Sequence, residues 1–256
     1  MVRIKKVQIP ELPVKKPRRL YIWLPQKYFK SEQYYPVLYM FDGHNVFYDS
    51  HASYGKSWGM KEYLTRSRLP LIIAAIECNH EGERRMNEYA PWDYDDSQLG
   101  SMEGQGKLTM DWITGPLKQY IDSTYRTLPD RDNTLIAGSS MGGLMSLYAV
   151  TAYNDVFSRA AALSPSFFFG GDHLHQLFSN TPLQEPTRIY MDTGTCEFDA
   201  GERGQIAELF ESAAELTCSG ADVAARVVPG ACHCEASWEK RIPIFMNYLL
   251  DEEVCQ

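Results

Sequence analysis

Short apolar runs alternate along this chain with longer segments in which apolar residues recur at helical spacing. The apolar runs predict strands at residues 36–41, 71–76, 134–138, 159–163, 187–192 and 222–228. The helical spacing predicts helices at residues 57–68, 107–125, 201–218 and 235–250, and a further helix that begins directly after Ser140. Because strands and helices alternate, we expect an α/β fold with a mostly parallel central sheet and helices on both faces.

Two stretches depart from this alternation. Residues 2–10 and 18–24 alternate polar and apolar positions on either side of Pro13 and Pro17, which predicts two antiparallel strands at one edge of the sheet. Residues 77–106 form a long polar segment rich in Tyr and Trp, which follows a predicted central strand. A loop of this length and composition favours an ordered wall beside a substrate.

Two residues in the predicted helices have an expected structural role. Ser57 is the expected N-cap of the helix at 57–68, and Pro116 is expected to kink the helix at 107–125. Neither repeats nor linkers interrupt the pattern. The sequence therefore predicts a single domain over residues 1–256, with little or no cap domain.

The charge and apolar content of the chain narrow its function class. It has 256 residues, a net charge of -8 and 44% hydrophobic residues. An acidic surface disfavours binding to nucleic acids or to anionic membranes. The first residues lack an apolar signal core and no run is long enough to span a bilayer, so a cytoplasmic location is expected. The oligomeric state cannot be predicted from these features.

The cysteines show no spacing typical of a disulfide framework. They are Cys78, Cys196, Cys218, Cys232, Cys234 and Cys255. In a cytosolic chain they are expected to be reduced. Cys232, His233 and Cys234 could contribute to a metal site together with Cys196, but no second Cys/His pair completes the usual zinc spacing. We therefore expect neither a metal nor a cofactor.

The segment from Gly138 to Gly142 has the pattern Gly-x-Ser-x-Gly between a predicted strand and a predicted helix. In such a turn the central Ser140 takes a strained backbone conformation, and its hydroxyl is exposed at the edge of the sheet. The backbone N–H of Met141, at the start of the helix, can then stabilise an oxyanion. The alternative is a glycine-rich turn in which a buried serine caps the helix.

A nucleophilic serine needs a histidine base and a carboxylate that orients the histidine. On a hydrolase sheet the chain order is serine, acid, histidine. His233 alone among the histidines follows the last predicted strand. For the acid we favour Glu197 over Asp192, which lies at the strand terminus, while Asp199 stays open as an alternative.

A second oxyanion donor is expected in the loop that follows the strand at 36–41. There Gly43 allows the backbone to turn inward, which makes the backbone N–H of His44 the candidate donor. Four further residues are candidates for substrate contacts: Asn45 in the same loop, and the aromatic residues Trp58, Trp92 and Phe167, whose rings suggest stacking of sugar or phenolic rings near Ser140.

At several places the sequence resembles the esterase branch of the α/β-hydrolase superfamily. The segments that carry the resemblance are 39–45, 136–143, 163–167, 192–197 and 230–233. This branch includes carbohydrate-acting acetyl and feruloyl esterases, S-formylglutathione hydrolases, trilactone-siderophore esterases of the enterochelin type, and mycolyltransferases. The resemblance implies an α/β-hydrolase fold, supports His44 and Met141 as oxyanion donors, and supports Glu197 as the triad acid.

The first loop narrows the choice within this branch. Formylglutathione hydrolases have His-Gly-Leu-Thr-Cys there, whereas this chain has Asp42-Gly43-His44-Asn45. We therefore expect a serine carboxylesterase that acts through an acyl-enzyme on small acyl or aromatic acyl esters, including those of sugars. The alternatives are a trilactone-siderophore esterase, an acyltransferase with the same residues, and a non-catalytic binding protein that kept the fold.

Overall fold

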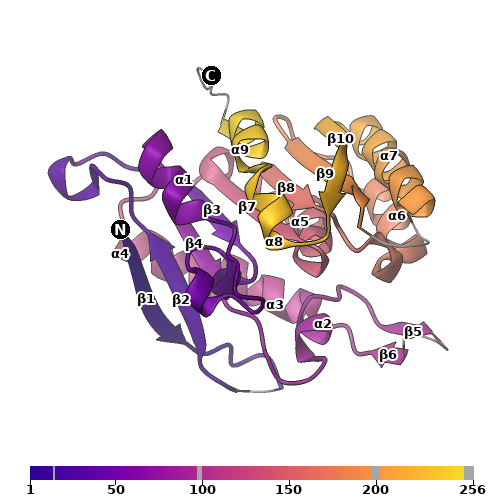
Figure 1. Cartoon of the computed structure of the whole chain (residues 1–256), viewed down its shortest axis with the longest axis horizontal. Coiled ribbons are helices and arrows are strands. Elements are labelled where there is room, and N and C mark those ends of the chain that lie inside the picture. Colours follow the sequence, from indigo (N-terminus) through magenta and orange to yellow (C-terminus); the bar gives the residue numbers. More distant parts are fainter. Residues whose placement is uncertain (14, 97–99, 198–201, 251–256) are drawn as a thin grey trace. The chain divides into compact units, whose positions relative to one another are not determined.

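In the computed structural model, the predicted strands and helices occur in the predicted order, with differences at several boundaries and with two helices, at Arg84–Glu88 and Gly171–Asn180, that were not predicted (Figure 1). The structure describes residues 1–13, 15–96, 100–197 and 202–250. By its internal contacts the chain divides into two units, Met1–Leu135 and Ile136–Gln256. The expectation of one domain over the whole chain stays a prediction.

The first unit contains a mixed sheet with the strand order β1-β2-β4-β3. Its elements are β1 (Val2–Val7), β2 (Arg18–Trp23), β3 (Val37–Met40), α1 (Met60–Ser67), β4 (Ile72–Ile76), α2 (Arg84–Glu88), β5 (Tyr94–Asp96), β6 (Gly100–Met102), α3 (Gly106–Trp112) and α4 (Lys118–Thr124). β3 and β4 are parallel and fully buried, as their continuous apolar runs predict. β1 pairs antiparallel with β2, which confirms the predicted edge strands.

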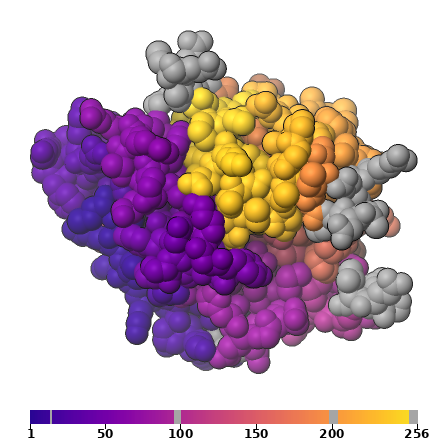
Figure 2. All heavy atoms as spheres, in the orientation of Figure 1, coloured from indigo at the N-terminus to yellow at the C-terminus, as the bar shows by residue number. Residues whose placement is uncertain are grey.

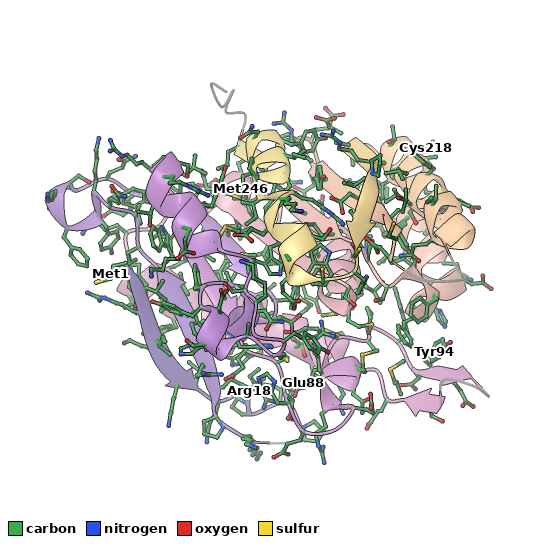
Figure 3. The ribbon with its side chains drawn as sticks, in the orientation of Figure 1. Met1, Arg18, Glu88, Tyr94, Cys218 and Met246 are labelled. Atoms are coloured by element: carbon green, nitrogen blue, oxygen red, sulfur yellow. The ribbon has the colours of Figure 1, made fainter. Side chains whose placement is uncertain are left out.

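Within the segment at 77–106, the described residues form the short helix α2 and the strands β5 and β6, which pair antiparallel. A buried ion pair connects α2 to the sheet. Nη2 of Arg18 in β2 lies 2.5 Å from Oε1 of Glu88 in α2, and both residues are labelled in Figure 3. The second carboxylate oxygen of Glu88 accepts a hydrogen bond from the backbone N–H of Asn79 at 3.1 Å. These contacts hold α2 against β2, since breaking a buried pair leaves a costly unpaired charge.

The prediction that Ser57 caps a helix is wrong, whereas Pro116 does lie where the regular helix is interrupted. α1 begins at Met60 with Gly59 as its N-cap, and the Ser57 hydroxyl instead donates to Asp49 Oδ1 at 2.7 Å. Gly59 takes a φ of 65°, a conformation that glycine adopts without strain and serine does not. At Pro116 the chain forms a π-helical turn, Ile113–Leu117, between α3 and α4. The wider turn accommodates the proline, which lacks an N–H and would clash with a regular helical turn.

The second unit contains a sheet with the strand order β7-β8-β9-β10. Its elements are β7 (Thr134–Ser139), which crosses from the first unit, α5 (Met141–Ala152), β8 (Arg159–Leu163), α6 (Gly171–Asn180), β9 (Arg188–Cys196), α7 (Glu202–Cys218), β10 (Asp222–Cys232), α8 (Glu235–Glu239) and α9 (Ile242–Leu250). β8 is parallel to β9, and β9 is parallel to β10. The predicted mostly parallel α/β arrangement is confirmed. Among the described residues, none of the helices combines the length and the apolar content needed to span a membrane.

Two boundaries in this unit differ from the prediction and both shape the site. β9 and β10 run past their apolar cores to Cys196 and Cys232, with a shift of register after Val228. The helix expected at 235–250 is two helices, because Pro243 has no N–H to donate to the carbonyl four residues earlier. Arg241 lies at the break and is buried, with 1% of its surface exposed.

Candidate active site

Ser140 lies on the sharp turn between β7 and α5 with φ 58° and ψ −126°, a strained conformation for a residue other than glycine. Two backbone hydrogen bonds hold it there. Its N–H donates to the carbonyl of Leu163 at 3.0 Å, and its carbonyl accepts from the N–H of Ser166 at 3.1 Å. The neighbouring strand and loop therefore determine the strained backbone, as the Gly-x-Ser-x-Gly pattern predicts.

The Ser140 hydroxyl is half-buried and makes no capping hydrogen bond to α5. Its oxygen lies 3.2 Å from Oγ of Ser166, a buried residue in the loop after β8. The side chain of Ser140 therefore does not cap the helix, as the alternative interpretation of this turn required. The hydroxyl remains available to react with a substrate.

Gly138 allows α5 to approach β7 closely. A Cβ at this position would lie 2.5 Å from the carbonyl oxygen of Gly142, a distance that real Cβ atoms do not adopt. Gly143 likewise has the carbonyl oxygen of Leu163 only 3.1 Å from where its Cβ would be. The glycines thus permit the tight strand-to-helix packing that positions Ser140.

We expect Gly138→Ala to lower the free energy of unfolding by about 1–3 kcal/mol, because backbone atoms must move to accept the methyl group. The matched control is Gly204→Ala in α7, where an added Cβ meets nothing within 4 Å. That change is expected to raise stability by about 1 kcal/mol through helix propensity. Urea unfolding of both variants measures the difference, and equal effects would contradict the packing role of Gly138.

Glu197 and His233 form a hydrogen-bonded pair at the carboxyl ends of β9 and β10. Glu197 Oε2 lies 3.2 Å from His233 Nδ1. The carboxylate side chain is only 1% exposed, whereas the imidazole is 23% exposed. The ring of His233 also packs edge-on against Trp238, with centroids 5.1 Å apart. The contact between Nδ1 and Glu197 sets the orientation of the imidazole ring.

The second oxygen of Glu197 is held by several donors. Oε1 accepts hydrogen bonds from Ser164 Oγ and from the backbone N–H of Gly194, both at 2.5 Å. Burial raises the pKa of Glu197, but the hydrogen bonds from His233, Ser164 and Gly194 together outweigh it and leave the pKa below its usual value. Glu197 is therefore a fixed, ionised acceptor for His233.

Sequence reasoning did not identify the residues that support Glu197. The Arg241 guanidinium lies 2.7 Å from Asp192 Oδ1, 3.1 Å from Ser164 Oγ and 3.5 Å from Glu197 Oε1. Trp238 also donates its indole N–H to Ser164 Oγ at 3.0 Å. The one signal that could have located Arg241 is Pro243, because a proline at this place predicts a helix break.

Asp192, the rejected acid, has a structural role in this network. Its carboxylate is fully buried, with Arg241 on Oδ1 and the hydroxyl of Tyr190 donating to Oδ2 at 2.7 Å. Burial raises the pKa of Asp192, and Arg241 only partly offsets this. The other alternative, Asp199, lies outside the described residues. Of the candidates that the structure describes, Glu197 is the carboxylate in contact with His233.

A family model described as "Putative esterase" matches residues 13–250. The chain belongs to this esterase family. The protein is accordingly a hydrolase of carboxylic esters. Among curated proteins, the esterase is similar to the uncharacterized protein YbbA of Bacillus subtilis (strain 168), with 24% identity over 184 residues that cover 70% of this chain and 69% of that protein.

Solved structures share the fold of this esterase at low identity. An IroE-like serine hydrolase from Shewanella oneidensis has a TM-score of 0.76 and 21% identity, with 97% of this chain and 79% of that chain covered. Ferric enterobactin esterase (fes) from Salmonella typhimurium has a TM-score of 0.74 and 16% identity, and the match covers 98% of this chain and 58% of that chain. The similarity establishes the predicted α/β-hydrolase fold.

The predicted oxyanion donor of the first loop lies in the first unit of the esterase. His44 is in the short helical turn Gly43–Asn45 after β3 and is buried. A Cβ on Gly43 would lie 2.4 Å from the carbonyl oxygen of Ala75 in β4, so only glycine fits there. Burial lowers the pKa of the His44 ring to about 4, which keeps the ring neutral. The oxyanion role of the His44 N–H stays a prediction.

The four predicted substrate contacts differ in accessibility. Trp58 and Phe167 are 3% and 2% exposed, which leaves little of their surface for a substrate. Asn45 and Trp92 are half-buried and stay candidates. Among the three consecutive phenylalanines, Phe168 is the exposed one, at 46%. Phe169, like Phe167, is buried.

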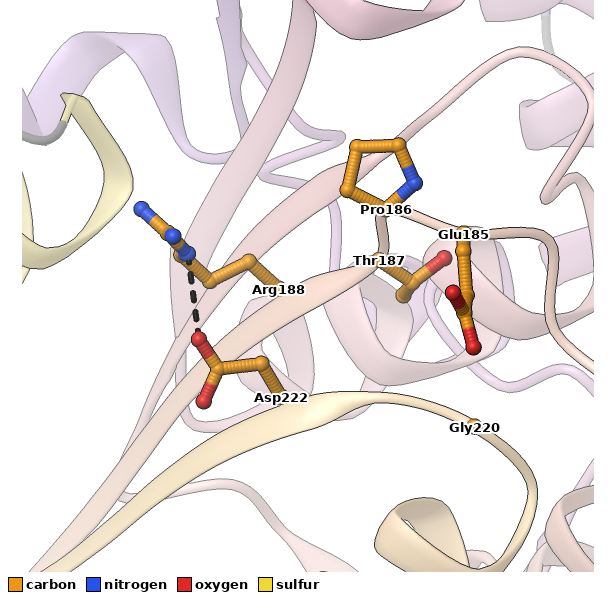
Figure 4. Close-up of a pocket in the computed structure, with 6 residues that line it drawn as sticks. All are labelled: Glu185, Pro186, Thr187, Arg188, Gly220 and Asp222. Atoms are coloured by element: carbon orange, nitrogen blue, oxygen red, sulfur yellow. Dashed lines mark ion pairs between the residues drawn. The ribbon is translucent and has the colours of Figure 1, made fainter.

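A surface depression of this esterase lies away from Ser140 (Figure 4). It is lined by Glu185, Pro186, Thr187, Arg188, Gly220 and Asp222. Arg188 and Asp222 form an ion pair at 3.3 Å at the start of β9 and β10. Ligands of open α/β sheets bind at the carboxyl ends of the strands. The depression is at the opposite ends and is not the reaction site.

Proposed function

We propose that the protein is a serine esterase in which Ser140 is the nucleophile, His233 the general base and Glu197 the residue that orients His233. The observation that carries this is the contact between Glu197 Oε2 and His233 Nδ1, with a buried and ionised Glu197. It occurs in a unit whose Ser140 sits on a strained turn with its hydroxyl accessible. This combination of residue roles is that of a nucleophilic triad.

In the first half-reaction, His233 Nε2 takes the proton of the Ser140 hydroxyl as the oxygen attacks the ester carbonyl carbon. The resulting oxyanion accepts a hydrogen bond from the N–H of Met141, the first residue of α5, and from the N–H of His44. The bond to the alcohol oxygen then breaks, and His233 returns the proton to the departing alcohol. The product of this step is an ester of Ser140.

In the second half-reaction a water molecule loses a proton to His233 and attacks the acyl carbon. The tetrahedral intermediate collapses, the bond to Ser140 Oγ breaks, and the proton returns from His233 to Ser140. The acid leaves and the enzyme is regenerated. Throughout, Glu197 stays ionised and stabilises the imidazolium that forms in each half-reaction.

For the substrate we propose small acyl or aromatic acyl esters, including those of sugars. Ser166 Oγ lies 3.2 Å from Oγ of Ser140, and the exposed side chain of Phe168 follows two residues later in the chain. This aromatic side chain, close in sequence to a residue that contacts the nucleophile, supports an apolar or aromatic acyl group. A second candidate is the ester of a trilactone siderophore. It is favoured by structural neighbours described as enterobactin esterases, whose similarity to this chain is in the fold.

The test is to measure kcat/KM for matched acetylated-sugar, feruloyl and trilactone esters, with Ser140→Ala as the blank. A preference of about 100-fold for one class, worth about 2.7 kcal/mol in transition-state binding, identifies the substrate class. A preference for the trilactone would replace the first candidate by the second. If Ser140→Ala hydrolyses the preferred ester as fast as the wild type, the proposed nucleophile is wrong.

A further inference from the structure

Two loops of the first unit bring two histidines and a cysteine together. His44 lies after β3, while Cys78 and His80 follow β4. One ring nitrogen of each histidine and the Cys78 sulfur all lie within 4.8 Å of one another. Imidazole nitrogen and thiolate sulfur are the ligands that zinc-type ions prefer, and three protein ligands make a known form of such a site.

Each imidazole already has one nitrogen engaged by a neighbouring side chain. His44 Nε2 lies 3.0 Å from Ser53 Oγ, and His80 Nε2 lies 3.1 Å from Glu77 Oε1. Contacts of this kind fix the orientation of metal-binding histidines and leave the other nitrogen for the ion. Both rings therefore have Nδ1 as the nitrogen available to a metal. The two rings meet edge to face, with centroids 4.3 Å apart.

The His44 ring supplies a second and independent observation. The residue is 2% exposed, and its Nδ1 is buried without a hydrogen-bond partner. A buried polar atom with no partner is unfavourable, because it has lost its hydrogen bonds to water and has gained none in the protein. Within a group that already contains a thiol and a second imidazole, a coordinated cation removes that cost.

We propose that His44, Cys78 and His80 bind a divalent transition-metal ion of the zinc class through two imidazole nitrogens and one sulfur. On binding, the Cys78 thiol releases its proton to solvent and the sulfur forms a bond to the ion, so one proton is released per ion bound. Two carboxylates lie beside the group: Glu77, which contacts His80 and pairs with Arg19 at 2.6 Å, and Asp42, which accepts a hydrogen bond from the Cys78 thiol. Asp42 is in turn held by Arg85 at 2.7 Å.

The other group of possible metal ligands among the described residues consists of His175, Glu208 and Glu211, and its histidine is already paired. His175 has one ring nitrogen 2.8 Å from Glu208 and the other 2.8 Å from Glu215. Neither nitrogen is left for a metal, and the group is accounted for as an ion-paired histidine between α6 and α7. It serves as an internal control.

Metal binding would connect the loop after β3 to the loop after β4. The first of these contains Gly43 and His44, so an ion on the His44 ring restricts the backbone of that loop as well. The inference does not depend on the proposed function, because it concerns binding and stability. Its consequence for the protein is a metal-dependent increase in thermal stability, by mass action on the folded state.

The experiment uses the full chain, treated with a chelator and then titrated with Co²⁺. We expect one equivalent to bind, with a visible ligand-field spectrum and a near-ultraviolet band from thiolate-to-cobalt charge transfer, and Zn²⁺ to displace it and raise Tm. Cys78→Ser is expected to abolish the charge-transfer band. Ser53→Ala, which removes only the partner of His44 Nε2, is expected to weaken binding by about 10-fold.

Control variants separate this site from adventitious binding. Cys218→Ser removes an exposed cysteine at the end of α7, and His175→Gln removes the ion-paired histidine; both are expected to keep the spectrum. His80→Gln changes a side chain that is 47% exposed, so it tests the site in a folded protein even if Cys78→Ser is unstable. A charge-transfer band that survives Cys78→Ser, unchanged affinity in His80→Gln, or failure to bind Co²⁺ would overturn the proposal.

Discussion

Replacing Ser140 by alanine is expected to lower kcat for ester hydrolysis by about 10⁶-fold, because the variant lacks the oxygen that forms the acyl-enzyme. Binding of the substrate is expected to change little. Tm should also stay close to that of the wild type, since the strained backbone at φ 58° is held by hydrogen bonds of the main chain. Burst and steady-state kinetics with an aryl ester measure the effect.

The matched control for this prediction is Ser166→Ala. Its hydroxyl lies 3.2 Å from that of Ser140 and is the alternative nucleophile nearest in space. We expect this variant to retain most of the wild-type turnover, because Ser166 is buried and lacks the strained turn. Loss of turnover in Ser166→Ala together with activity in Ser140→Ala would reverse the assignment.

Glu197→Gln is expected to lower kcat by about 10⁴-fold while leaving the protein folded. In the wild type both carboxylate oxygens accept from N–H donors: Oε2 from His233 Nδ1 and Oε1 from the backbone of Gly194. An amide can satisfy one of these donors, but its NH₂ group then faces the other. Either His233 Nδ1 then has no oxygen acceptor to orient the ring, or the substituted side chain at position 197 moves away from His233.

Asp199→Asn is the control, because Asp199 is the other acid that the sequence allows. It is expected to leave kcat near the wild-type value. The measurement is kcat against pH for both variants, together with Tm to show that Glu197→Gln folds. A large loss in Asp199→Asn with near-normal turnover in Glu197→Gln would show that the acid has been assigned wrongly.

Much of the fold could be predicted from the sequence because its signals are local. Continuous apolar runs identify β3 and β4 as strands buried on both faces. The glycine at 138 permits close packing of α5 on β7, and this requirement can be recognised from the spacing alone. The strained φ of Ser140 follows from a local pattern, and the positions of Glu197 and His233 after predicted strands are local signals too, although the contact between them joins two separate loops.

The sequence by itself therefore determined the fold class and the position of the strand-turn-helix segment around Ser140, and it favoured Glu197 as the partner of His233 while Asp199 stayed open. Only the tertiary structure decided how Glu197 is held, because Arg241 reaches it from a helix break far along the chain. The grouping of His44 with Cys78 and His80 was likewise decided in space. The propensity to form a helix or a strand depends on residues that are neighbours in the sequence. These contacts instead join residues that are distant in the sequence, so they depend on the path of the folded backbone.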